Sequence, residues 1–237
     1  MRIAIVAAMP EEVAPLRARL DGGRLGGQEV EVVVTGDGAR NARAGAMRAL
    51  AGGRVDALVV LGVSGALTPS LATADLIVGA RVKDEEGRTY EAAPAQIAAI
   101  AQTTGGRPAL VMSARKIADT VAEKTRLARL AELDAGGRPA VVDLESAAYV
   151  AAAEQARVPW IVLRAVSDTA GEALPAILNR SADSSGSVNR GRVLRGLFSD
   201  PGALPHLLTL RKRVNQCADV LARAAEAAVR ITAGGSA

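Results

Sequence analysis

The chain has almost none of the side chains from which disulfide frameworks, zinc sites and histidine-based triads are built. Its 237 residues include one cysteine, Cys217, and one histidine, His206. A single cysteine forms no disulfide within the chain, and this pair cannot supply the three or four ligands of a zinc site. Most catalytic triads also need a histidine that is placed among other catalytic residues. We therefore expect neither a disulfide nor a bound metal.

Aromatic residues and blocks of like charge are scarce as well. Phe, Trp and Tyr together make up 2% of the chain, and the net charge of +4 comes from basic residues interleaved with acids. Proteins that bind nucleic acids usually present a basic stripe or a row of aromatic side chains. We therefore expect no nucleic-acid partner.

Long apolar runs are also absent. No stretch reaches the roughly 18 consecutive apolar residues that a transmembrane helix needs. The first residues, MRIAIVAAMPEEV, lack the basic flank and the cleavage site of a signal peptide. These absences predict a cytoplasmic protein.

Hydrophobic residues nevertheless make up 49% of the sequence, enough for a sizeable core. Short runs rich in β-branched residues alternate with stretches of helical character, and several of these runs are apolar at successive positions, which is typical of strands covered on both faces. The expected strands are 2–8, 29–35, 56–62, 75–82, 108–113, 140–143 and 160–167, and the expected helices are about 11–20, 39–51, 116–134 and 145–157. The pattern predicts one α/β domain over 1–237, a three-layer α/β/α sandwich around a central mixed sheet.

The last part of the chain, 190–231, is expected to be a helical segment. Apolar side chains recur at spacings of three and four from Leu207 to Ile231 and form one stripe along a helix. We expect this stripe to pack on the sheet; a seam with a partner subunit and a contact with a membrane surface are the alternatives. The segment 170–189 is rich in Ser, Gly and Asn and is expected to be a loop near the ligand.

Acids and small polar residues follow several of the expected strands. They are, in chain order, Glu11 and Glu12, the stretch GVSGA (62–66), Asp143 and Glu145, and Ser167 and Asp168. Ligands of doubly wound sheets gather beyond the carboxyl ends of the strands, so we expect these residues to meet at one edge. Buried carboxylates there are suited to accept hydrogen bonds from sugar hydroxyls or to perform acid–base chemistry. Structural roles stay open for Glu145, as the first acid of a helix, and for Asp168, as a turn residue.

The stretch TGDGARNARAG (35–45) contains part of a dinucleotide-binding fingerprint. Asn41 stands in place of the third glycine, and no clear ribose-binding acid follows about 20 residues later. We therefore expect no nicotinamide or flavin cofactor, and no other cofactor. The glycines are expected to form a tight turn before a helix.

Five motifs resemble, in the same order, those of the nucleoside phosphorylase and nucleosidase superfamily, and within it the methylthioadenosine/S-adenosylhomocysteine nucleosidases. They are IAIVAAMPEEV, VVVTGDGARNA, LVVLGVSGALTPSLATADLIVG, VVDLESAAYVAAA and VPWIVLRAVSDTA, and they run from the start to about residue 170. The resemblance implies a nucleoside phosphorylase-like sandwich and an enzyme that cleaves the N-glycosidic bond of an adenosine-type nucleoside. It also implies a homo-oligomer, a dimer or larger.

The resemblance assigns roles to particular residues. It implies that Glu145 holds the ribose hydroxyls, that Asp168 protonates the purine as its bond to C1′ breaks, and that Glu12 binds or activates the attacking water. The other substrate-binding positions that it implies are Gly62, Val63, Ser64, Gly65, Ile117, Asp143, Leu144 and Ser167.

The chain departs from the pattern of the family in three places. Val63 stands where the family has a serine, Ile117 stands where it has an aromatic residue that stacks on the base, and the segment after VGARV is short. These departures imply an open pocket that tolerates a bulky 5′ substituent. The tail GRVLRGLFSDPGALPHLLTLRKRVNQCADVLARAA resembles that of hopanoid-associated phosphorylases, which act on adenosylhopane. For such a lipid-linked substrate, basic residues 211–213 are expected to make a weak contact with a membrane surface.

Water and phosphate both remain open as the nucleophile, and the sequence favours water. Phosphorolysis needs an anion cradle, normally of arginines and backbone N–H groups. The arginine that bacterial purine phosphorylases place before the glycine-rich turn falls on Val60, which leaves Arg40 and Arg43 as candidates. A protein that kept the fold but only binds a nucleoside is the alternative from a different class.

Overall fold

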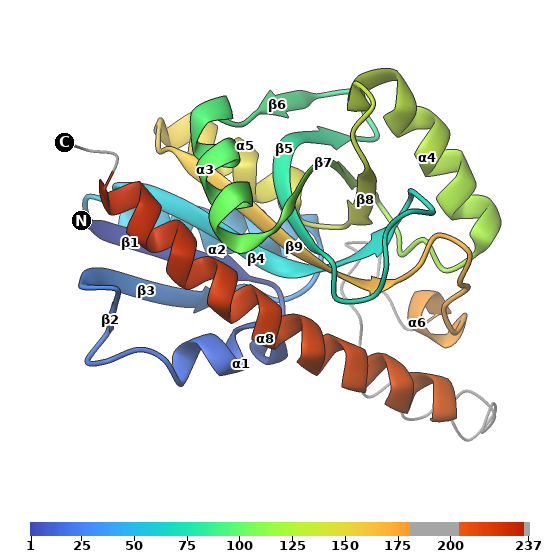
Figure 1. Cartoon of the computed structure of the whole chain (residues 1–237), viewed down its shortest axis with the longest axis horizontal. Helices are drawn as coiled ribbons and strands as arrows, with labels where there is room; N and C mark the ends of the chain where they lie inside the picture. Colours follow the sequence, from blue (N-terminus) through green and yellow to red (C-terminus); the bar gives the residue numbers. More distant parts are fainter. Residues whose placement is uncertain (181–203, 235–237) are drawn as a thin grey trace.

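The computed structural model describes residues 1–180 and 204–234, and in this part of the chain helices cover a nine-stranded mixed sheet (Figure 1). The strands are β1 (Arg2–Ala7), β2 (Arg24–Leu25), β3 (Gln28–Val34), β4 (Ala57–Ala66), β5 (Leu76–Asp84), β6 (Thr89–Glu91), β7 (Arg107–Ser113), β8 (Ala140–Asp143) and β9 (Trp160–Asp168). The helices are α1 (Pro10–Arg17), α2 (Ala39–Ala51), α3 (Pro94–Thr104), α4 (Val121–Ala135), α5 (Ser146–Ala156), α6 (Ile177–Arg180) and α8 (Leu204–Gly234). The predicted α/β class with a central mixed sheet is confirmed.

The sheet closes on itself at one end, which the alternation of strands and helices did not predict. β4 pairs in parallel with β1 and β9, β9 pairs antiparallel with β5, and β5 pairs in parallel with β7. β7 then pairs with β8, and β8 returns to the end of β4 through the antiparallel pairs Gly65↔Val142 and Ala66↔Val141. A residue at the end of β4 therefore has β8 on one side and β9 on the other. Gly65 lies opposite both Val142 and Asp168.

The stretch GVSGA does not form the turn that we expected after the third strand. It continues β4, in register with β9 from Gly62↔Arg164 to Ser64↔Val166, and a register shift follows at Ser64/Gly65. Its glycines do not form a turn; they allow side chains of the neighbouring strand β9 to approach the backbone of β4 closely. A Cβ atom on Gly62 would lie 1.8 Å from Nη1 of Arg164, and one on Gly65 would lie 2.8 Å from Oδ2 of Asp168.

Among the helices, one was not predicted and another begins later than expected. The helix α3 was not predicted, because its sequence PAQIAAIAQTT buries only Ile97 and Ile100 and has a weak apolar period. A proline at its start and the left-handed Gly105 after its end are the local signals for it. The helix expected from 116 begins at Val121, because the side chain of Thr120 accepts a hydrogen bond from the N–H of Glu123 and caps it.

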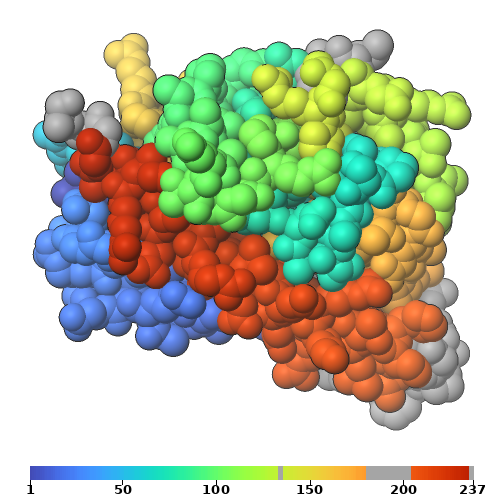
Figure 2. All heavy atoms as spheres, in the orientation of Figure 1, coloured from blue at the N-terminus to red at the C-terminus, as the bar shows by residue number. Residues whose placement is uncertain are grey.

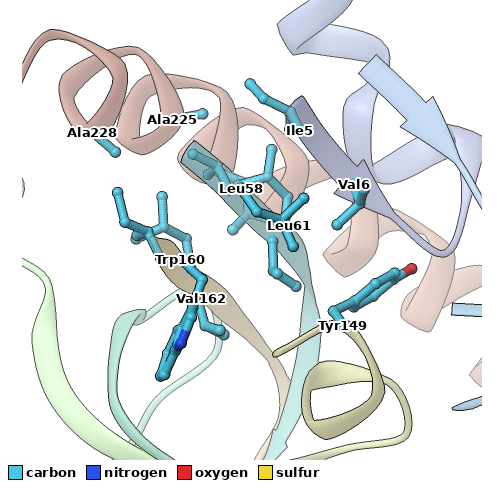
Figure 3. Packing of buried hydrophobic residues seen from close by; sticks show 14 of the residues in the cluster. Ile5, Val6, Leu58, Leu61, Tyr149, Trp160, Val162, Ala225 and Ala228 are labelled. Carbon is cyan, nitrogen blue, oxygen red and sulfur yellow. The ribbon is translucent and has the colours of Figure 1, made fainter. Parts of the chain in front are cut away.

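The helix α8 crosses one face of the molecule as a continuous band between α1 and α3 (Figures 1 and 2). The predicted packing of its apolar stripe is confirmed in its second half, where Cys217, Leu221, Ala224 and Ala228 are buried. Figure 3 shows Ala225 and Ala228 above Leu58 of β4 and Trp160 of β9, with Tyr149 of α5 further along the core. Small side chains let the helix lie close to the sheet.

The part of the expected helical segment before α8, 190–203, lies outside the described residues, as does 181–189 of the expected loop. Within 1–180 and 204–234, no helix is long and apolar enough to cross a bilayer.

We predict that Leu221→Ala lowers the free energy of unfolding by about 2–5 kcal/mol, because removal of the buried leucine side chain leaves a cavity between α8 and the sheet. Leu208→Ala, on the same helix but 56% exposed, serves as the control and should change it by less than about 0.5 kcal/mol. Urea unfolding of both variants measures the difference. Equal effects would mean that α8 does not belong to the core.

Candidate active site

A cavity of about 270 Å³ opens where β4, β8 and β9 end. All but one of the residues to which the resemblance assigns a place in the site line it, namely Glu12, Val63, Ser64, Gly65, Ile117, Asp143, Leu144, Glu145, Ser167 and Asp168. The exception, Gly62, lies beneath the wall, where its missing side chain makes room for the guanidinium of Arg164. The closed end of the sheet thus brings together residues that are up to 156 positions apart in the chain (12 to 168).

Arg164 is a charged residue of the site to which the sequence had assigned no role. It lies in the middle of β9, and its side chain is 1% exposed. The guanidinium forms an ion pair with Asp143, and its Nε and Nη2 donate to Oγ of Ser146 at 3.1 and 2.9 Å. A buried guanidinium is costly unless it is paired, so these partners are what permit it. The signal in the sequence that could have identified this residue was an arginine inside an otherwise apolar strand.

Asp143 is held by protein groups on every side. It accepts a hydrogen bond of 2.6 Å from Oγ of Ser113, and both of its carboxylate oxygens lie within 3.3 Å of the N–H of Ser146 at the start of α5. Together with the ion pair to Arg164, these contacts make it mainly a structural residue at the cavity wall.

Glu12 faces the cavity from the first turn of α1 and is 2% exposed. Its Oε2 accepts from the N–H of Met9 at 2.8 Å, and its Oε1 accepts from the N–H of Val63 at 2.9 Å. Burial raises the pKa of Glu12 above its ordinary value, although Arg164 and the two N–H groups act against this. Val63 holds Glu12 through its backbone, so this contact does not depend on the side chain at position 63.

Glu145 immediately precedes α5, but its side chain does not cap that helix. Its Oε1 accepts instead from the N–H of Gly38 at 2.7 Å, at the start of α2. Gly36 and Gly38 have φ of 91° and 87°, so the predicted tight turn before α2 is confirmed, and Asp37 between them lines the cavity. Burial raises the pKa of Glu145 well above its ordinary value, and the neighbouring Asp143 raises it further.

Asp168 is the last residue of β9 and is buried, so it is not the turn residue that we considered as an alternative. Its Oδ1 accepts from Oγ of Ser167 at 2.6 Å, and its Oδ2 accepts from Nζ of Lys124 at 2.5 Å. Lys124 is a second residue without a role in the sequence analysis, because a lysine in a helix usually lies at the surface. Ser64 is also buried, and its Oγ has no hydrogen-bond partner among the residues that the structure describes.

The remaining wall of the cavity is apolar. Ile117 and Leu144 line it near the strand ends, and Leu174, Leu178, Leu210 and Val214 line it from the segment after β9 and from α8. The charged side chains among the described lining residues are all carboxylates, namely Glu12, Asp37, Asp143, Glu145 and Asp168. Neither Arg40 nor Arg43 reaches the cavity: Arg40 is exposed on α2, and Arg43 donates to Gln155. Over the described ranges, no group of three His, Cys, Asp or Glu side chains is arranged to hold a metal.

Comparison with known proteins places this chain in a family. Residues 2–116 match the model of the Phosphorylase superfamily. The chain is 30% identical over 202 residues to a 5′-methylthioadenosine/S-adenosylhomocysteine nucleosidase of Geobacillus kaustophilus. The match covers 73% of this chain and 86% of the relative. The chain belongs to the phosphorylase superfamily. It is an enzyme of the nucleosidase or nucleoside phosphorylase kind, as the resemblance implied.

Solved structures from the superfamily share the fold. An S-adenosylhomocysteine nucleosidase of Streptococcus pyogenes superposes with a TM-score of 0.74 at 20% identity, covering 97% of this chain and 96% of that one. A futalosine hydrolase of Helicobacter pylori superposes with a TM-score of 0.70 at 17% identity, covering 97% of each chain. The superfamily fold thus extends over nearly the whole chain.

We predict that Glu145→Gln makes the protein more stable, and increasingly so as the pH rises. The folded-state pKa of Glu145 lies above its unfolded value, so ionisation of this carboxyl destabilises the folded protein as the pH rises through the folded-state pKa. Glutamine stays neutral and can still accept from Gly38. The gain in Tm over the wild type should therefore be larger near pH 8 than near pH 5, by a few degrees.

Asp56→Asn is the control of opposite sign. Hydrogen bonds from the N–H of Arg2 and from Arg54 lower the pKa of Asp56, so its neutralisation should lower Tm near pH 8. A Glu145→Gln gain that is the same at both pH values would contradict the raised pKa.

Proposed function

We propose that this enzyme hydrolyses the N-glycosidic bond of an adenosine-type ribonucleoside that carries an apolar 5′ group. The observation that carries the proposal is the meeting of Glu12, Glu145 and Asp168, from three distant segments, around one cavity whose described charged lining is entirely acidic. Cleavage of this bond passes through an oxocarbenium-like transition state, and carboxylates stabilise the positive charge that develops on the sugar.

Each carboxylate has one task in this proposal. Glu145 accepts hydrogen bonds from the ribose hydroxyls, and Glu12 takes a proton from the water that attacks C1′. The electron pair of the C1′–N9 bond goes to the purine, which needs a proton from Asp168 as it leaves. Ser167 holds Asp168 through its hydroxyl. The orphan hydroxyl of Ser64 at the cavity wall is a further candidate for a substrate hydrogen bond.

Water is the better nucleophile for this cavity. A phosphate ion would enter among carboxylates and would need arginines or lysines to hold it. Arg164, the buried arginine beneath the cavity, is engaged by Asp143 and Ser146. Among the residues that the structure describes, none that lines the cavity is Arg or Lys. The matching relatives and solved structures that bear the names of nucleosidases and of a hydrolase support the same choice.

The apolar wall supports an apolar 5′ group. Leu174 and Leu178, after β9, and Leu210 and Val214 of α8 line this part of the cavity. A chain attached at the 5′ position would bury apolar surface along this wall. A lipid-linked adenosine is the finer form of the proposal.

The remaining expectations about partners stay predictions. Arg213, one of the three basic residues expected at a membrane surface, binds both carboxylate oxygens of Glu172 at 2.6 and 2.7 Å. It is therefore not available for headgroups, and Arg211 and Lys212, both exposed, would carry a weak contact alone. Assembly into a homo-oligomer and a cytoplasmic location are proposed on the same footing. The binding-only alternative is disfavoured because Glu12, Glu145 and Asp168 are all retained.

We predict that Asp168→Asn slows release of free base by at least about 100-fold, the usual scale for loss of a general acid. Release of adenine from an adenosine-type riboside, in buffer with and without phosphate, measures it. Wild-type turnover should be the same in both buffers. Asp219→Asn, an exposed position on α8, is the control and should keep wild-type turnover.

Two results would contradict this prediction in different ways. Turnover of Asp168→Asn close to that of the wild type would remove Asp168 from the mechanism. Turnover that requires phosphate would replace hydrolysis with phosphorolysis.

We predict that kcat/KM for 5′-alkylthioadenosines rises with chain length, by at least about tenfold from methyl to octyl, because each buried CH₂ contributes up to about 0.8 kcal/mol. Leu210→Asn should remove most of this gain while sparing the methyl compound, and Leu208→Asn, which does not line the cavity, should keep it. Competition between the two substrates measures the preference. A clear preference for the methyl compound would leave a nucleosidase for small 5′ groups.

A further inference from the structure

Lys124 is a buried lysine that the proposed chemistry has not yet used. It lies near the start of α4, and its side chain is 1% exposed. Nζ donates to Oδ2 of Asp168 at 2.5 Å, to the carbonyl oxygen of Thr169 at 2.7 Å and to that of Glu172 at 2.8 Å. These three acceptors match the three hydrogens of an ammonium group.

The contacts of Nζ favour an ionised pair at rest. The ammonium group uses all three donors, and both oxygens of Asp168 accept a hydrogen bond, from Lys124 and from Ser167. At rest, the pair is therefore an ammonium beside a carboxylate, and the proton that a leaving purine needs lies on nitrogen rather than on Asp168.

The geometry points to Lys124 as the residue that holds the proton delivered by Asp168. The inference rests on the proposed function, and Lys124 acts only through Asp168, as a positioning residue that also keeps the proton. Nζ of Lys124 passes a proton to Oδ2 of Asp168, and Asp168 gives a proton to the base as the C1′–N9 bond breaks and its electron pair goes to the purine. This leaves a neutral amine beside a carboxylate. After the base has left, Glu12 releases to solution the proton that it took from the attacking water, and solution returns a proton to the amine.

The surroundings of Nζ fit both states of the lysine. A neutral amine keeps two hydrogens and gains one lone pair. The carbonyls of Thr169 and Glu172 can keep the two hydrogens, and the lone pair then faces Asp168, so the transfer needs no movement of either side chain. Burial of both side chains favours it, since a dry site brings a charged pair and a neutral pair closer in free energy.

The neighbouring charged groups do not interfere near neutral pH. Burial raises the pKa of the Cys217 thiol on α8 to about 11, so it stays neutral. The carboxylate of Glu172 is paired with Arg213 of α8. Glu12 and Glu145 are acids of the same cavity whose pKa is raised by burial, that of Glu145 to about 8, and both are present in every variant. Comparison of each variant with the wild type at the same pH therefore cancels their contribution.

The test compares Lys124→Met and Lys124→Arg by release of base from an adenosine-type riboside near pH 5 and near pH 8. In Lys124→Met, the buried Asp168 lacks a counter-charge and takes up a proton of its own in acid. Its deficit should be less than about 10-fold near pH 5 and at least about 30-fold larger near pH 8, where that proton is lost. In Lys124→Arg, the guanidinium keeps its proton, so the deficit should be at least about 100-fold at both pH values. Arg129→Met, exposed on the same helix, should match the wild type.

A purely structural lysine would give the opposite order. Arginine would then restore turnover better than methionine, and the deficit of Lys124→Met would not depend on pH; either result overturns the inference. If thermal unfolding shows that Lys124→Arg does not fold, the pH dependence of Lys124→Met decides, with Lys124→Gln as a second neutral variant. Asp168→Asn separates the two proposals. If it keeps full turnover, the role of Asp168 fails, whereas if it is slow and both Lys124 variants match the wild type, only this inference fails.

Discussion

The buried guanidinium of Arg164 is the charge on which the arrangement of the cavity depends. Glu12, Asp143 and Glu145 all lie in a largely apolar setting, and without a cation among them they would repel one another and take up protons. Arg164 pairs directly with Asp143 and lowers the pKa of both glutamates from below the cavity floor. This requires the absence of a side chain at Gly62, where any Cβ would collide with the guanidinium.

The site contains a second buried cation, and the two differ in chemistry. Arg164 serves the acids on the side proposed for the sugar and carries a charge that it does not lose near neutral pH. Lys124 serves Asp168 on the side proposed for the base, and an ammonium group can give up its proton. The proposed reaction requires this division, with an arginine where a permanent charge is needed and a lysine where a proton must move.

The acid and the apolar wall are connected through the segment that follows β9. Lys124 binds Asp168 and also the carbonyls of Thr169 and Glu172, and the side chain of Glu172 binds Arg213 on α8. This segment then leads to Leu174 and Leu178 at the cavity. The same contacts therefore fix the proposed proton donor and the proposed pocket for the 5′ group. The raised pKa values of Glu12 and Glu145 show that this arrangement costs stability, as is common at functional sites.

The sequence by itself determined the α/β class, most strand and helix positions and the apolar stripe of α8, because each depends on local periodicity. It also pointed to Glu12, Glu145 and Asp168, through their places after strands and through the resemblance of five motifs. Only the tertiary structure decided that Arg164 and Lys124 belong to the site and that GVSGA continues a strand. The ion-pair partners of Arg164 and Lys124 lie on other segments of the chain: Asp143 is 21 positions before Arg164, and Asp168 is 44 positions after Lys124. Closure of the sheet between β8 and β4 brings these segments together, and no local pattern specifies that closure.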